Sequence, residues 1–179
     1  ATLSDIDMRS GLGEMLKVHA IADPKAFDEI ASDYQALLQD RELLLHYVMR
    51  SLEIKRRFIE TDEFDEGPRL VLNYGHSFGH AIEAATEFAI PHGIAITIGM
   101  DLANFVAVQL GYTEKPLYER MHPALWQNYQ EFSEFPVKVQ AVMEALRRDK
   151  KNKGKDLQLL LPDRNGSIVL VRHQEESDF

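Results

Sequence analysis

The chain has 179 residues, 45% of them hydrophobic and 27% charged, which is typical of one globular domain or of a fragment of a larger protein. Its net charge of −9 argues against a general nucleic-acid or acidic-membrane binder. The absence of cysteine excludes disulfides and thiolate metal sites, and no apolar run has membrane-spanning length. We therefore expect a cytoplasmic protein. Because the sequence starts at Ala1 without an initiator Met, we expect a trimmed domain.

The spacing of apolar residues predicts a mainly α domain, bundle-like, with a small C-terminal β-hairpin. Residues 1–9 are expected to form a loop. Helices are expected at residues 10–21, 24–38, 40–58, 73–88, 93–110, 114–130 with a break at Pro123, and 135–146. Two strands are expected at residues 157–161 and 167–171, joined by a turn whose Asn165-Gly166 pair favours a hairpin. The helix at 93–110 is apolar nearly all round, so it should be central and buried.

Local signals mark several helix ends. Ser10 is a candidate N-cap, Pro24 suits the first helical position, and Gly111 suits a helix end. Gly11 and Gly13 weaken the first predicted helix, but they also permit a close approach of backbone or ligand.

The candidate functional stretch is residues 69–93, which holds three of the seven histidines. His76 and His80 are four apart, so they share one face of a helix, and His92 follows Pro91. Two or three imidazoles with one carboxylate form a divalent metal site that keeps a position open for substrate. Glu14 is our candidate carboxylate. The stretch lacks the general base of a zinc-protease His-Glu-x-x-His motif.

Each of these residues also has a simpler interpretation. Histidines four apart occur by chance on many helices. Glu14 and Lys17 are spaced for a surface ion pair, and Lys55 lies near a predicted helix end, where a cation suits the dipole.

Two places in the sequence carry residues that could bind an anionic ligand. Arg69 and Asn73 are predicted to lie one turn apart and one turn before His76, an arrangement that suits an oxyanion ligand. A basic run at residues 147–155 interrupts the acidic chain. Such runs are usually solvated loops, but this one lies between a helix end and a strand.

The segment from Arg69 to Glu83, RLVLNYGHSFGHAIE, resembles the signature of the 3-dehydroquinate synthase family, and Glu14, Lys17, Lys55, His92-Gly93 and Asp149-Lys150 follow the family's order. The resemblance spans nearly the whole chain and implies the family's C-terminal helical half, so residues 1–179 would form one metal- and substrate-binding domain. We expect the family's N-terminal nucleotide-binding domain to be absent from residues 1–179, since they hold no glycine-rich strand-turn-helix element.

The resemblance implies a role for each site residue. Glu14, His76 and His92 would bind a divalent metal, zinc or cobalt, and His80 would contact substrate and relay a proton. Lys55 and Arg69 would hold the substrate carboxylate, Asn73 and Lys150 its phosphate, and Lys17 a ring oxygen. NAD would come from the missing domain. The substrate would be a seven-carbon keto acid phosphate of the shikimate route, and the protein would be a homodimer.

Three positions depart from the family pattern: Ile94 replaces the usual Glu after His92-Gly93, Ser77 replaces the commoner Thr, and Asp65 replaces a Glu. Alternatives therefore stay open. Other sugar phosphate cyclases act on sedoheptulose or glucose phosphates, which lack a carboxylate, and the presence of both Lys55 and Arg69 favours the keto acid. A metal-dependent polyol dehydrogenase and a helical module without catalysis are the remaining interpretations.

Overall fold

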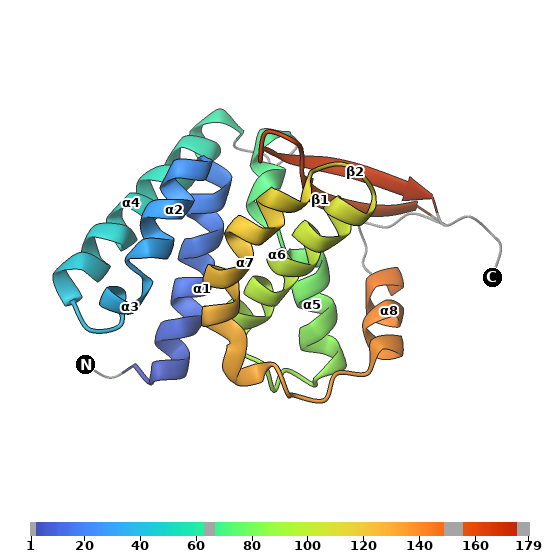
Figure 1. Cartoon of the computed structure of the whole chain (residues 1–179), viewed down its shortest axis with the longest axis horizontal. Helices are drawn as coiled ribbons and strands as arrows, with labels where there is room; N and C mark the ends of the chain where they lie inside the picture. Colours follow the sequence, from blue (N-terminus) through green and yellow to red (C-terminus); the bar gives the residue numbers. More distant parts are fainter. Residues whose placement is uncertain (1–2, 63–66, 149–155, 175–179) are drawn as a thin grey trace.

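The computed structural model describes residues 3–62, 67–148 and 156–174. These residues form a bundle of helices with one two-stranded antiparallel hairpin lying across an end of it (Figure 1). The predicted fold class is therefore confirmed. No helix among these residues is long and apolar enough to cross a membrane.

The helices and strands follow the predicted order with several changed boundaries. The α-helices are α1 (Asp5–Ala22), α2 (Pro24–Ser32), α3 (Tyr34–Leu37), α4 (Arg41–Thr61), α5 (His76–Ala85), α6 (His92–Gln109), α7 (Lys115–Tyr129) and α8 (Val139–Arg148). Two 3-10 helices are η1 (Pro68–Asn73) and η2 (Gln130–Phe132). Strands β1 (Asp156–Pro162) and β2 (Ile168–Gln174) pair with Pro162 opposite Ile168.

Helix α6 lies at the centre, as its all-round apolar sequence predicts (Figure 1). Ile94, Ile96 and Met100 are fully buried, and α1, α5 and α7 pack against the helix. Gly111 follows its end with a φ of 75°, a left-handed conformation that costs glycine nothing. The core thus surrounds the helix whose first residue is His92.

The prediction of a loop over residues 5–9, with Ser10 as the N-cap of the next helix, was wrong. Helix α1 starts at Asp5, and its N-cap is Ser4 rather than Ser10. The Ser4 hydroxyl accepts from the Asp7 amide at 3.1 Å while the Asp7 carboxylate accepts from the Ser4 amide at 3.3 Å, which is a capping box. Residues 5–7 are exposed, so this first turn has no apolar periodicity to reveal it.

Helix boundaries also differ around α4. The predicted helix 24–38 is divided at Asp33, and its start at Pro24 after the Asp23 cap is confirmed. Helix α4 runs to Thr61, so Lys55 lies before its last turn and the dipole interpretation of Lys55 is wrong.

The segment before α5 is not α-helical. Arg69 and Asn73 lie on η1, which has about three residues per turn, so four residues no longer bring them to one face. Gly75, with a φ of 77°, then redirects the chain into α5. The prediction that one α-helix carries Arg69, Asn73 and His76 was therefore wrong.

Two proline predictions also need correction. Helix α7 continues through Pro123 without a break, because the lost hydrogen bond concerns only the carbonyl of the exposed Glu119. Helix α8 begins at Val139 rather than at Phe135.

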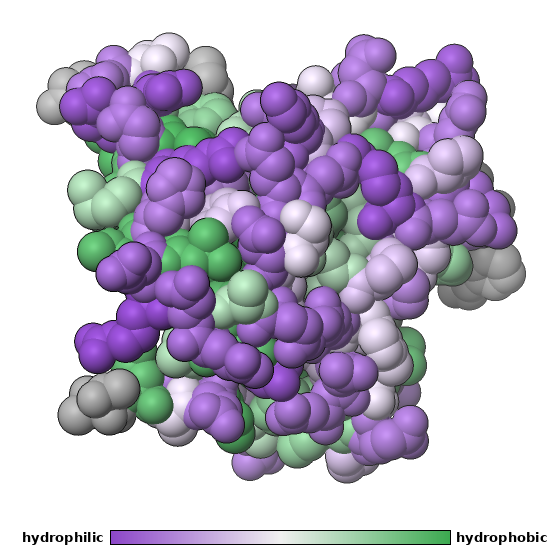
Figure 2. Space-filling view, turned by 60° about the vertical axis from the view of Figure 1, so that its left-hand side comes forward, coloured by the Kyte–Doolittle hydropathy of each residue, from purple (hydrophilic) through white to green (hydrophobic). Residues whose placement is uncertain are grey.

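The outer face of α4 carries several exposed apolar side chains. Figure 2 brings the left-hand side of Figure 1 forward, and hydrophobic side chains surface there among polar ones. The exposed apolar residues of α4, here called the α4 stripe, are Leu45, Val48, Met49, Leu52 and Ile59.

Candidate metal centre

A close crossing of α1 and α6 brings Glu14 and His92 together. A Cβ atom on Gly13 would lie 2.2 Å from the carbonyl oxygen of Gly93, and one on Gly93 would lie 1.8 Å from that of Ser10. Only glycine permits backbones this close. The Ser10 hydroxyl also accepts the Gly93 amide hydrogen at 2.9 Å. Because Glu14 follows Gly13 and His92 precedes Gly93, the crossing aligns carboxylate and imidazole.

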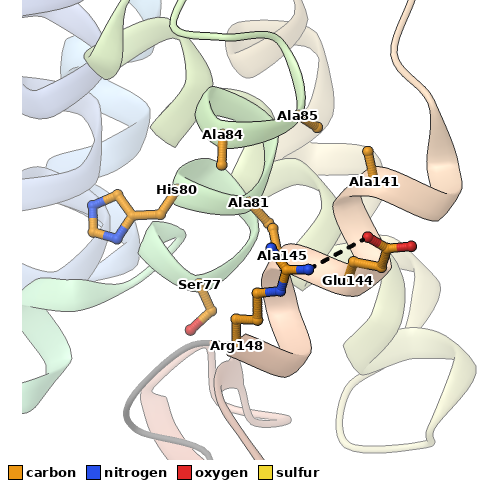
Figure 3. Close-up of a pocket in the computed structure, with 9 residues that line it drawn as sticks. All are labelled: Ser77, His80, Ala81, Ala84, Ala85, Ala141, Glu144, Ala145 and Arg148. Atoms are coloured by element: carbon orange, nitrogen blue, oxygen red, sulfur yellow. Dashed lines mark ion pairs between the residues drawn. The ribbon is translucent and has the colours of Figure 1, made fainter.

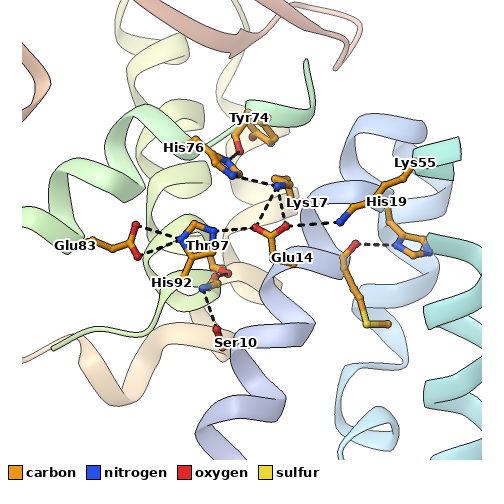
Figure 4. Close-up of polar contacts among 12 residues, drawn as sticks. Ser10, Glu14, Lys17, His19, Lys55, Tyr74, His76, Glu83, His92 and Thr97 are labelled. Carbon is orange, nitrogen blue, oxygen red and sulfur yellow. Dashed lines mark hydrogen bonds and ion pairs between the residues drawn. The ribbon is translucent and has the colours of Figure 1, made fainter. Parts of the chain in front are cut away.

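A second close crossing positions α5 against α6. A Cβ on Gly99 would lie 2.1 Å from the carbonyl oxygen of Gly75, directly before His76. The rings of His76 and His80 have centroids 5.1 Å apart, so the predicted shared face is confirmed. The His92 ring lies 5.6 Å from that of His76 and 5.8 Å from that of His80. Three imidazoles from two helices therefore meet. Figure 4 shows two of them, His76 and His92, beside Glu14 of α1.

Two of the histidine rings are held by acceptors on their Nδ1 atoms. His76 Nδ1 lies 3.2 Å from the carbonyl oxygen of Tyr74. His92 Nδ1 lies 3.1 and 3.2 Å from the two carboxylate oxygens of Glu83. Because these oxygens accept hydrogen bonds, both contacts favour the tautomer with the hydrogen on Nδ1, which leaves the Nε2 lone pair for a metal.

The distances fit a small divalent cation. Tetrahedral zinc with bonds of about 2.0–2.1 Å separates neighbouring ligand atoms by roughly 3.4 Å. His92 Nε2 lies 3.7 Å from Glu14 Oε1, and ring nitrogens of His76, His80 and His92 lie within 4.8 Å of one another. One carboxylate with imidazole nitrogens is a donor set that zinc and cobalt accept. The residues therefore fit a metal, with either Glu14 or His80 completing the set formed by His76 and His92.

Lys17 is part of this centre rather than of the surface. It is 3% exposed, and its Nζ lies 2.9 and 3.1 Å from the Glu14 carboxylate oxygens and 3.5 Å from His76 Nε2 (Figure 4). The interpretation of Glu14 and Lys17 as a surface ion pair was therefore wrong. Lys55 Nζ reaches the same carboxylate at 4.0 Å. The centre thus joins one anion to two ammonium groups.

Electrostatics keep the ligand atoms in metal-binding form. Burial raises the pKa of the Glu14 carboxyl, but Lys17, His76 and Lys55 outweigh that effect, so its pKa is lowered and the group stays ionised. Burial, together with the nearby Lys17, lowers the pKa of His76 to about 3. His76 is therefore neutral at physiological pH, and burial lowers the pKa of Lys17 as well.

His80 lies between the other two histidines and a groove that it also lines. Figure 3 shows its ring pointing away from Arg148, while Ser77 points toward the lower side of the same helix. The groove, about 480 Å³, runs between α5 and α8 and is lined mostly by alanines, with Arg148 paired to Glu144 at 3.9 Å. His80 therefore belongs to the histidine cluster, as its spacing from His76 predicts.

The remaining predicted site residues lie on η1, in the core or outside the described residues. Arg69 and Asn73 lie on η1, whose end is three residues before His76, and both are partly buried. Lys150 and Asp65 lie outside the described residues. Ile94 faces the core and is fully buried, so this departure from the family pattern does not face the metal centre.

The sequence did not reveal the hydrogen-bond acceptors that hold the proposed metal ligands in place. Glu83 appeared in the signature without a role, and Ser10 was read as a cap instead of a partner of Gly93. It also missed a polar cluster between α6 and α7, where the Asp101 carboxylate accepts from His122 at 2.7 Å and Tyr129 at 2.5 Å, and where burial raises the pKa of Asp101. All these contacts join residues at least nine apart, which no local pattern reveals.

Comparison with known proteins agrees with this geometry. The family model described as 3-dehydroquinate synthase C-terminal matches residues 11–152. The chain belongs to the 3-dehydroquinate synthase family. The 3-dehydroquinate synthase of Dictyoglomus thermophilum is 32% identical over 180 residues, covering 99% of this chain and 50% of the relative. That of Dictyoglomus turgidum is 34% identical over 180 residues, with the same coverage. The chain thus spans about half the length of these curated relatives.

Solved structures of sugar phosphate cyclases share the fold. A 2-deoxy-scyllo-inosose synthase, solved with carbaglucose-6-phosphate, NAD⁺ and Co²⁺, superposes with a TM-score of 0.78 at 19% identity, covering 97% of this chain and 51% of that one. The 2-epi-5-epi-valiolone synthase of Streptomyces hygroscopicus, solved with NAD⁺ and Zn²⁺, gives 0.79 at 23% identity, covering 96% and 48%. At these identities the likeness concerns the fold alone.

Proposed function

We propose that this chain is the metal- and substrate-binding half of a 3-dehydroquinate synthase, a carbon–oxygen lyase. The enzyme would convert 3-deoxy-D-arabino-heptulosonate 7-phosphate to 3-dehydroquinate and phosphate on the shikimate pathway, with NAD held by a nucleotide-binding half outside this chain. By itself the chain would be inactive, because hydride transfer needs that cofactor.

One observation carries the proposal. The Glu14 carboxylate meets His92 at 3.7 Å, while Lys17 and Lys55 approach the same carboxylate at 2.9 and 4.0 Å. A set of metal ligands bordered by buried or half-buried ammonium groups suits an anionic substrate with a chelating hydroxyl. Two ammonium groups at one site are notable in a chain whose net charge is −9. The relatives named 3-dehydroquinate synthase, at 32–34% identity, support the same assignment.

The proposed metal ligands are Glu14, His76 and His92. When bound there, a divalent metal such as zinc or cobalt supplies a Lewis acid that lowers the pKa of a coordinated substrate hydroxyl. Two contacts favour Glu14 over His80 as the third ligand: His92 Nε2 faces the Glu14 carboxylate, and His76 Nε2 lies 3.5 Å from the Lys17 ammonium that this carboxylate binds.

The other residues would bind substrate and move protons. Lys55 and Arg69 would pair with the substrate carboxylate, Asn73 and Lys150 with its phosphate, and Lys17 with a ring oxygen. His80, with its ring stacked on His92 at 5.8 Å, is the residue that we assign to proton relay. The reaction then needs oxidation of the ring hydroxyl, loss of phosphate, reduction by the returned hydride and an aldol ring closure.

The α4 stripe supports the assignment of a partner domain. At 100° per residue, Leu52 and Ile59 lie within about 60° of Lys55 around the helix axis, so the stripe adjoins the edge of the metal centre. A nucleotide-binding half that presents NAD to this centre would cover both. The relatives' other half has the required length, since they are about twice as long as this chain. A homodimer and a cytoplasmic location remain expectations.

A second candidate is another sugar phosphate cyclase, which the fold likeness to such enzymes favours. Lys55 distinguishes the two, because a cation beside Glu14 suits a substrate carboxylate that sedoheptulose and glucose phosphates lack. A polyol dehydrogenase would instead accumulate NADH from an alcohol without releasing phosphate.

The decisive assay uses the longer protein that joins this chain to its nucleotide-binding half, supplied with NAD and zinc. We expect phosphate release from the seven-carbon keto acid phosphate, its loss in His76→Ala, and little release from sedoheptulose 7-phosphate or glucose 6-phosphate. Release from only the latter substrates would assign the second candidate. A chain that binds no zinc, with a His76→Ala variant indistinguishable from wild type, would indicate a helical module without catalysis.

A further inference from the structure

A buried carboxylate stands behind one proposed metal ligand. Glu83 of α5 is 8% exposed, and both of its carboxylate oxygens lie within 3.2 Å of His92 Nδ1 (Figure 4). The opposite ring nitrogen, Nε2, is the one near Glu14. Glu83, His92 and Glu14 therefore form a line in which the imidazole separates two carboxylates.

We propose that Glu83 is a positioning residue, which accepts the Nδ1 hydrogen of His92 and so fixes this ring with Nε2 toward the metal. This inference rests on the proposed metal centre. A neutral imidazole has two tautomers, and only the one protonated on Nδ1 offers Nε2 to a cation. A carboxylate on Nδ1 selects that tautomer and raises the basicity of Nε2.

The surroundings of His92 make such a partner necessary. Its side chain is 47% exposed, whereas the Glu83 side chain is 10% exposed. A half-exposed ring at the first residue of α6 is free to change rotamer unless a buried group holds it. The Tyr74 carbonyl does the same for His76, so both imidazoles have an oxygen acceptor behind them.

Two other roles for Glu83 make different predictions. As a metal ligand it would need to lie on the Nε2 side of His92, but its oxygens contact Nδ1. As a simple tie between α5 and α6 it would change folding stability without changing metal affinity in the folded chain. Metal affinity and the tautomer of His92 therefore separate positioning from a structural role.

The test compares zinc affinity by chelator competition in the 179-residue chain, using Glu83→Gln, Glu83→Ala and the control Glu87→Gln. Glu87 is an exposed carboxylate four residues further along. Loss of such partners typically weakens metal binding about 10–100-fold, so we expect about 10-fold for the amide, which keeps an acceptor oxygen, and about 100-fold for alanine. Glu87→Gln should match the wild type, and circular dichroism checks the fold of each variant.

A measurement on the unmodified chain keeps the test independent of folding. At pH 8 without metal, ¹⁵N NMR of His92 should show the hydrogen on Nδ1, and the Co²⁺ absorption spectrum should change in Glu83→Gln. Hydrogen on Nε2, or unchanged zinc affinity in both folded Glu83 variants, would overturn the inference while the metal centre stands. A chain in which His92→Ala leaves zinc binding intact would instead overturn the proposed metal ligands.

Discussion

The glycine crossing of α1 and α6 offers a sharp test of how the fold makes the metal centre. In Gly13→Ala, the new Cβ would lie 2.2 Å from the Gly93 carbonyl oxygen and 2.5 Å from the Thr97 hydroxyl. The carbonyl is backbone and cannot rotate away. Reaching an ordinary contact of 3.4 Å requires the two helices to separate by about 1.2 Å.

That displacement is large for a metal ligand set. It would increase the distance between Glu14 Oε1 and His92 Nε2 from 3.7 Å to about 4.9 Å. Metal–ligand distances tolerate changes of only about 0.2 Å. We therefore expect zinc affinity to fall at least about 100-fold, more than a lost outer partner costs. Overpacking should also cost about 1–3 kcal/mol of unfolding free energy, partly offset by alanine's helix propensity.

The matched control is Gly11→Ala on the same helix. A Cβ there meets nothing within 4 Å, so the variant should keep wild-type zinc affinity and gain about 0.5–1 kcal/mol of stability. Isothermal titration with zinc, well below the melting temperature, measures the affinities. Wild-type affinity in a folded Gly13→Ala would refute the idea that this crossing aligns Glu14 with His92.

Three further predictions concern Lys17, His19 and Leu52. Lys17→Met should keep or tighten zinc binding, because it removes the ammonium 2.9 Å from Glu14, while activity of the longer protein falls about 100-fold; weaker zinc binding would contradict this. Burial lowers the pKa of His19 in the folded chain. The neutral side chain therefore stabilises the fold fully above the unfolded-state pKa near 6.5, and this stabilisation is lost as the pH falls toward the folded-state pKa. Chemical denaturation should therefore show up to about 1.4 kcal/mol lost per pH unit below 6.5, and a smaller loss in His19→Gln; equal losses would contradict it. Leu52→Asp should change the stability of this chain by less than about 0.5 kcal/mol, yet lower the melting temperature of the longer protein, as scanning calorimetry would show.

The sequence predicted those features that depend on neighbours along the chain. The i, i+4 spacing of His76 and His80 fixes their shared face, and the all-round apolar pattern of residues 93–110 requires burial. Pro24 starts its helix because its fixed φ and missing amide suit the first turn. These outcomes need no knowledge of the rest of the fold.

Features that depend on tertiary contacts escaped the sequence. Nothing local indicates that Lys17 is buried against Glu14, because the same spacing suits a surface pair. The pairing of Glu83 with His92 depends on how the chain turns between α5 and α6. Gly13 and Gly93 were each visible as glycines, but their contact exists only in the crossing of two distant helices.

The central claim is that Glu14, His76 and His92 bind one divalent cation. Crystals of the zinc-loaded chain, measured at the zinc absorption edge, test it directly. We predict one anomalous peak per chain, with a Glu14 oxygen and the Nε2 atoms of His76 and His92 about 2.0–2.2 Å away. A peak bound by other residues, or none among these three side chains, would contradict the claim.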